Sequence, residues 1–86
     1  MKKFIVNTAI LTPKTDPEYC AASAPRMLQN SGVKDVKIVS CFCCSTEGRV
    51  VFVVDADGRD KVLEALSRIN VPVASIIEAE EVKPKM

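Results

Sequence analysis

The chain has 86 residues, which suffice for one small domain, and 48% of them are hydrophobic, as is usual for soluble proteins. The net charge is +1 and the basic residues are scattered, which argues against a nucleic-acid partner, and no apolar stretch reaches the length of a membrane span. The short apolar start is interrupted at Asn7, which argues against a signal peptide, so we expect a single cytoplasmic domain over residues 1–86.

The first predicted elements are a strand and a helix. Phe4–Leu11 is rich in β-branched and aliphatic residues, which predicts a strand. Asp16 is a favourable N-cap and Pro17 suits the first helical position, so a helix should begin there. It should run to about Ser31, with Gly32 as its C-cap.

A proline interrupts the pattern of this first helix. Inside a helix, proline removes one backbone hydrogen bond, so Pro25 predicts either a kink or a late start. The apolar face expected from helical spacing carries Cys20 or Ala21, Ala24, Met27 and Leu28. A second strand should follow over Val36–Cys44.

A hairpin should join the second strand to a third one. Its turn is Ser45–Gly48, in which Gly48 suits a positive φ. The third strand, Arg49–Asp55, contains the uninterrupted apolar run Val50–Val54. Because successive side chains of a strand point to opposite faces, this run predicts that both faces of the sheet are covered.

A second helix and a fourth strand complete the chain. Asp57 is placed to cap this helix, and Asp60 follows three residues later, as in a capping box. The helix should end at Asn70–Pro72, and Ala74–Val82 should form the last strand. The buried stripe of the helix is expected to consist of Val62, Leu63, Leu66 and Ile69.

The order of these elements predicts an α+β fold of the ferredoxin-like βαββαβ type. Right-handed crossovers then give a four-stranded antiparallel sheet with two helices on one face. The helices leave the other face open, although the third strand is apolar on both sides. A second copy of the same sheet is the simplest cover, so we expect the chain to pair with itself, as a homodimer through the open sheet face.

Three segments carry a resemblance to a known superfamily: Lys3–Val6 (KFIV), Gly48–Asp57 (GRVVFVVDAD) and Val71–Glu78 (VPVASIIE). On these segments the chain resembles small domains of unknown function in the dimeric α/β-barrel superfamily of ferredoxin-like proteins. The resemblance implies the fold and a dimer, and some of these relatives look like nickel-binding proteins. Their metal sites depend on histidine, however, and this chain has no His. Any metal site here must therefore be argued from the cysteines.

Three of the four cysteines fall within four residues, in the sequence Cys41-Phe42-Cys43-Cys44. Thiolates bind soft metals, exchange disulfides and react with oxidants. In a strand, Cys41 and Cys43 point the same way with Cα atoms roughly 6.6 Å apart, a spacing at which both sulfurs can bind one metal ion. Cys44 should point to the opposite face unless the hairpin turn begins there and swings its side chain round.

The predicted fold brings the fourth cysteine to the same place. Cys20 lies in the first turns of the first helix, and the start of that helix shares one end of the domain with the end of the second strand. All four sulfurs should therefore gather at one edge. The candidate metal ligands are Cys41, Cys43, Cys44 and Cys20, and no catalytic residue is expected.

Three functions remain open for these cysteines. The first is a small homodimeric binding module, rather than an enzyme, that holds Zn²⁺, Cu⁺ or Ni²⁺ through the cysteine cluster. The second is a redox protein whose thiols cycle between dithiol and disulfide. The third is a small-ligand-binding dimer with purely structural cysteines, because free cysteine packs as a small hydrophobe.

Overall fold

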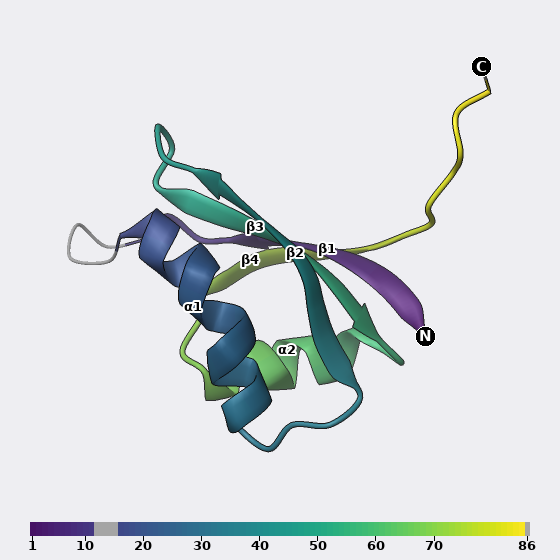
Figure 1. The fold of residues 1–86 in the computed structure, drawn as a ribbon, viewed down its shortest axis with the longest axis horizontal. Helices are drawn as coiled ribbons and strands as arrows, with labels where there is room; N and C mark the ends of the chain where they lie inside the picture. The colour runs from purple at the N-terminus through teal and green to yellow at the C-terminus, as the bar shows by residue number, and fades with distance from the viewer. Residues whose placement is uncertain (12–15, 86) are drawn as a thin grey trace.

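The computed structural model describes residues 1–11 and 16–85, and it shows a four-stranded antiparallel sheet with two helices (Figure 1). The predicted ferredoxin-like βαββαβ fold is confirmed. No helix in the described part of the chain is long and apolar enough to cross a membrane. The elements are β1 (Lys2–Thr8), α1 (Pro17–Asn30), β2 (Val36–Cys44), β3 (Arg49–Ala56), α2 (Arg59–Arg68) and β4 (Val73–Ala79).

The strands lie in the order β2-β3-β1-β4, and each neighbouring pair is antiparallel. β1 and β2 therefore run in the same direction on either side of β3, and they end at the same edge of the sheet. Figure 1 shows the β2–β3 hairpin and the start of α1 close to this edge. A backbone hydrogen bond of 2.8 Å from Leu11 N to Gly48 O ties the segment after β1 to the hairpin. We call this edge the hairpin end of the domain.

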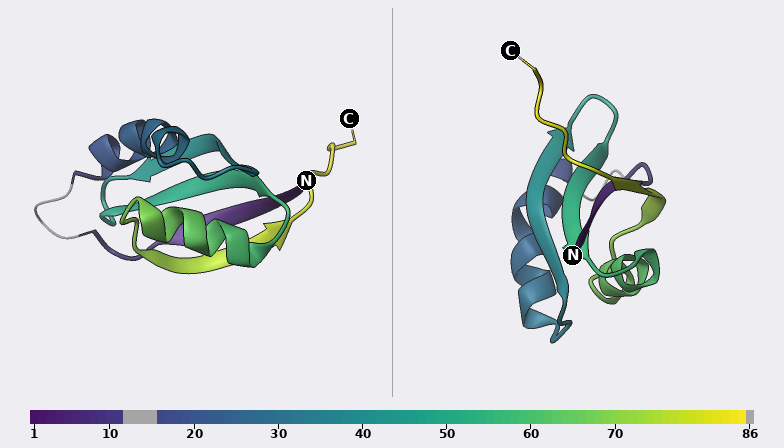
Figure 2. Two further views of the ribbon diagram at one scale, coloured as in Figure 1. Left: turned by 90° about the horizontal axis from the view of Figure 1, so that it is seen from below. Right: turned by 90° about the vertical axis from the view of Figure 1, so that its right-hand side faces the viewer.

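The hydrophobic core lies between the helices and one face of the sheet, which is strongly twisted (Figure 2). On β1, the buried residues Phe4 and Val6 alternate with partly exposed ones, and Phe52 and Val54 do the same on β3. Because alternate side chains of a strand share a face, this pattern shows that one face is covered and the other is open. The helices bury Ala24, Leu28, Val62, Ala65 and Leu66.

The ends of α1 follow the local signals in its sequence. Asp16 Oδ1 accepts a hydrogen bond of 3.0 Å from Glu18 N, and Pro17 is the first helical residue. The C-cap is Ser31 rather than Gly32, and Gly32 follows it with φ of 81°, a left-handed conformation that glycine adopts without steric cost. The helix runs from Pro17 through Pro25, so the alternative of a late start at Pro25 is wrong.

The start of α2 differs from the prediction. Its N-cap is Gly58 rather than Asp57, and no side chain makes a capping hydrogen bond there. Asp57 instead lies 3.8 Å from Lys61 Nζ, in an exposed ion pair one helical turn away. The backbone turns into the helix one residue later than expected, which places the Asp57 side chain outside its first turn.

The buried stripe of α2 is displaced around the helix from the predicted one. Leu63 is 49% exposed, whereas Ala65 is fully buried in its place. The buried residues of the helix thus follow the i, i+3, i+4, i+7 spacing that begins at Val62 and ends at Ile69. Leu63 lies about 100° around the helix from Val62 and falls outside this stripe.

Two strands end earlier than predicted. β1 ends at Thr8 rather than Leu11, and its pairing with β3 already ends at Asn7, opposite Val51. β4 ends at Ala79 rather than Val82. Ala79 pairs with Lys3, so β1 has almost no residues left with which a longer β4 could pair.

Candidate thiol site

The register between β2 and β3 decides which way the strand cysteines face. Residues paired across an antiparallel ladder point to the same side of the sheet. Cys41 pairs with Phe52 and Cys43 pairs with Val50, and both of these partners are fully buried under the helices. Cys41 and Cys43 therefore share the face that α1 covers, as their alternate spacing predicts.

Cys44 lies on the opposite face from Cys41 and Cys43. It pairs with Arg49, which alternates with the buried residues of β3 and so belongs to the open face. Cys44 is still paired as the last residue of β2, and its carbonyl oxygen accepts a hydrogen bond of 3.1 Å from Glu47 N across the turn. The turn therefore does not swing Cys44 round to the helix side.

α1 brings Cys20 to the cysteines on the helix face. Cys20 lies in the first turn of the helix, where its backbone N–H donates to Asp16 O at 3.0 Å, and it packs against the core as Cys41 does. Burial raises the pKa of the Cys20 thiol most, and the nearby Cys43 raises it further. The pKa of Cys41 is raised in the same way, by burial first and then by Cys20. We call Cys20, Cys41 and Cys43 the thiol cluster.

The three members of the thiol cluster differ in their access to solvent. Cys43 is exposed, with its Sγ 3.3 Å from Ser45 Oγ, whereas Cys20 and Cys41 are half-buried. Within the described residues, no three His, Cys, Asp or Glu side chains already stand in position to hold a metal ion. A metal ion bound by all three thiols therefore requires a rearrangement of these side chains.

Thiol reactivity should follow burial and should rise with pH. The thiolate is the reactive form, and the raised pKa values of Cys20 and Cys41 keep both protonated at neutral pH. We expect iodoacetamide to modify Cys43 first, and to modify Cys20 and Cys41 slowly at neutral pH and faster as the pH is raised. Peptide mass spectrometry measures the three rates separately. Equal rates at neutral pH would contradict this order.

Cys20 also lines a pocket that could not be predicted from the sequence. Its volume is about 160 Å³, and it lies between α1 and the segment that follows α2. Tyr19, Met27 and Val71 line it together with Cys20, so its wall is mostly apolar. The two segments are far apart along the chain, which is why only the fold reveals that the Cys20 thiol borders a pocket.

The comparisons with known proteins leave the fold and the thiol cluster as the basis for a function. The ferredoxin-like arrangement of β1 to β4 agrees with the fold that the superfamily resemblance implies. No family model, no curated protein and no solved structure matches the chain.

Proposed function

We propose that the protein is a small binding module that takes up a soft metal ion through the thiol cluster. The observation that carries this proposal is the position of Cys20, which the fold places beside Cys41 and Cys43 although it is distant in sequence. Soft thiolate ligands select ions such as Cu⁺ and Zn²⁺ over Mg²⁺ and Ca²⁺. The chain thus offers a soft-ligand site at its hairpin end.

Among the soft metals, Cu⁺ suits this site best. The helix face offers three thiols, because Cys44 points to the other face. Structural Zn²⁺ sites use four protein ligands in a tetrahedron, and Ni²⁺ in square-planar sites prefers nitrogen and oxygen ligands. Cu⁺ is a soft ion that two or three thiolates satisfy, so it needs no ligand beyond Cys20, Cys41 and Cys43.

Metal uptake at this site releases protons. Because burial raises the pKa of Cys20 and Cys41, both are thiols at neutral pH, and an incoming metal ion must displace their protons. The apparent affinity therefore rises with pH. The same pKa directions disfavour the redox alternative, because thiols that act in disulfide exchange have a lowered pKa.

Anaerobic titration with Cu⁺ against a chromophoric copper chelator tests the proposal. We expect the native chain to bind about one Cu⁺, and Cys41→Ser to weaken this affinity by roughly 100-fold or more, since even loss of a residue that only supports a ligand costs 10–100-fold. Cys44→Ser is the matched control, because it removes a thiol from the same strand but from the opposite face. Its affinity should equal that of the native chain.

The other outcomes of this titration separate the alternatives. Equal weakening by Cys41→Ser and Cys44→Ser would contradict the assignment of the site to the helix face. Protein that takes up no metal but forms a reversible disulfide within the thiol cluster would support the redox function. If neither is seen, the cysteines are packing residues, and small-ligand binding becomes the best remaining function.

We also propose that the chain works as a homodimer, joined through the open sheet face. Phe42 is 58% exposed there and Ile77 is 54% exposed, and exposed apolar side chains on both edge strands of one sheet face favour a partner. Two sheets pack face to face at about 10 Å, so a second copy covers the whole face at once. The apolar side chains of this face are Ile5, Phe42, Val51, Val53 and Ile77.

The proposed compartment is the cytoplasm. All four cysteines are free in the structure. Clustered free thiols persist where glutathione and thioredoxin keep them reduced, and a thiolate metal site requires that reduced state.

A further inference from the structure

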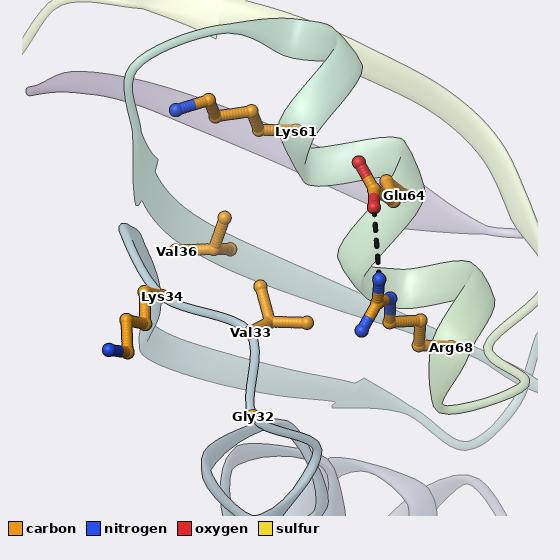
Figure 3. Close-up of a pocket in the computed structure, with 7 residues that line it drawn as sticks. All are labelled: Gly32, Val33, Lys34, Val36, Lys61, Glu64 and Arg68. Carbon is orange, nitrogen blue, oxygen red and sulfur yellow. Dashed lines mark hydrogen bonds and ion pairs between the residues drawn. The ribbon is translucent and has the colours of Figure 1, made fainter.

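A cleft at the end of the domain opposite the thiol cluster combines basic side chains with an apolar wall. It has a volume of about 330 Å³ and lies between the loop that joins α1 to β2 and one side of α2 (Figure 3). Lys34 comes from the loop, whereas Lys61 and Arg68 come from α2. None of its residues belongs to the thiol cluster, so its role is independent of metal binding.

The side chains that line the cleft carry an excess of positive charge. Glu64 is the one carboxylate among them, and its Oε1 accepts a hydrogen bond of 3.3 Å from Arg68 Nη2. This bond uses one of the five N–H donors of the guanidinium. Lys61 has a partner outside the cleft, Asp57, at 3.8 Å, and Lys34 forms no ion pair within residues 1–11 and 16–85. The wall of the cleft thus holds three cations and one carboxylate, and two of the cations, Lys61 and Arg68, already pair with a carboxylate.

The apolar part of the cleft comes from two valines. Val33 and Val36 are half-buried, and Figure 3 shows their side chains in the space between the loop and α2. In the same view the guanidinium of Arg68 extends from α2 toward the loop. A ligand with an apolar body and one anionic group finds a complementary surface for both parts here.

The backbone of the loop holds these groups in a defined arrangement. Gly32 has φ of 81° and Asp35 has φ of 67°, so a left-handed residue stands on each side of Val33 and Lys34. Aspartate is one of the few residues besides glycine that adopt this conformation readily. Ser31 Oγ accepts a hydrogen bond of 3.4 Å from Val33 N and so supports the start of the loop.

We propose that this cleft binds a small organic anion. The apolar body of the ligand lies on Val33 and Val36, and its carboxylate or phosphate group binds the Arg68 guanidinium, with Lys34 and Lys61 at the rim of the cleft. Guanidinium and ammonium groups make their strongest hydrogen bonds with such oxyanions. The proposal requires both parts of the ligand. An uncharged ring or a bare inorganic anion should therefore bind more weakly than a ligand that has both parts.

Four probes test this requirement by NMR on the full ¹⁵N-labelled chain. Benzoate and phenyl phosphate carry both a ring and a charge, benzyl alcohol carries only the ring, and inorganic phosphate carries only the charge. We expect saturable shifts of the amides in residues 32–36 and in α2 with benzoate or phenyl phosphate, and at least about tenfold weaker binding of the other two probes. Which of the two charged rings binds more tightly distinguishes carboxylate from phosphate ligands.

Variants assign the binding to the cleft. Arg68→Gln should weaken binding of the charged ring by about tenfold, the contribution of one charge-assisted hydrogen bond, whereas Lys34→Gln, which removes a charge at the rim of the cleft, should weaken it less. Arg26→Gln is the matched control, because it removes an exposed cation of α1 that does not line the cleft. Unchanged amide spectra outside the cleft confirm that each variant is folded.

Three results would overturn the proposal. The first is benzyl alcohol binding as tightly as benzoate and phenyl phosphate, and the second is the absence of saturable shifts at residues 32–36 with either charged ring. The third is equal weakening by Arg26→Gln and Arg68→Gln, which would reveal attraction to the overall charge of the chain.

Discussion

Replacing Phe52 with alanine should lower the free energy of unfolding by about 3–5 kcal/mol, the usual cost of removing a buried aromatic ring. Phe52 is fully buried on β3, where it pairs with Val6 of β1 on one side and with Cys41 of β2 on the other. Its ring therefore fills the centre of the covered face of the sheet. A small domain has a total stability of only about 5–15 kcal/mol, so this one change removes a large part of it.

Urea unfolding followed by far-UV circular dichroism measures this loss. Phe42→Ala is the matched control, because Phe42 is the same residue type in the same sheet but is 58% exposed in the single chain. At protein concentrations low enough to keep the chain monomeric, it should cost less than about 1 kcal/mol. Equal losses in the two variants would contradict the assignment of Phe52 to the covered face.

Much of the fold could be predicted because its signals are local. The alternation of apolar residues on β1, the N-cap at Asp16 and the positive φ of Gly32 and Gly48 each depend on a few neighbouring residues. The two features of α2 that differ from the prediction, its N-cap and its buried stripe, depend on tertiary structure instead. Whether Leu63 is exposed is decided by how the helix is rotated against the sheet, and a helical pattern alone does not determine that rotation.

The four cysteines differ in how well their positions could be predicted from the sequence. The shared face of Cys41 and Cys43 follows from the two-residue period of a strand, and the approach of Cys20 follows from the topology. The direction of Cys44 could not be predicted, because it depends on whether the turn begins at that residue or one residue later. A shift of one residue reverses the face in a strand.

No feature of the sequence predicts the cleft beside α2. Lys34 and Arg68 look like ordinary solvated charges in the sequence, since scattered basic residues indicate no site. They meet because the loop after α1 and the side of α2 lie next to each other in the fold, with Val33 between them. Sites built from single residues of distant segments leave no motif to detect.

The homodimer proposal gives the second large expected effect: Phe42→Lys should weaken self-association by roughly 100-fold, because aromatic residues that an interface buries are frequent hot spots, each of which contributes about 2 kcal/mol or more. Phe42 pairs with Val51 on the open face, so a lysine there would place an unpaired charge between two apolar sheets. Sedimentation velocity across a concentration series measures the change.

Tyr19→Lys is the matched control, since Tyr19 is 69% exposed on α1, away from that face. Dissociation by Tyr19→Lys but not by Phe42→Lys would place the interface on the helices, and a native chain that stays monomeric throughout would contradict the dimer.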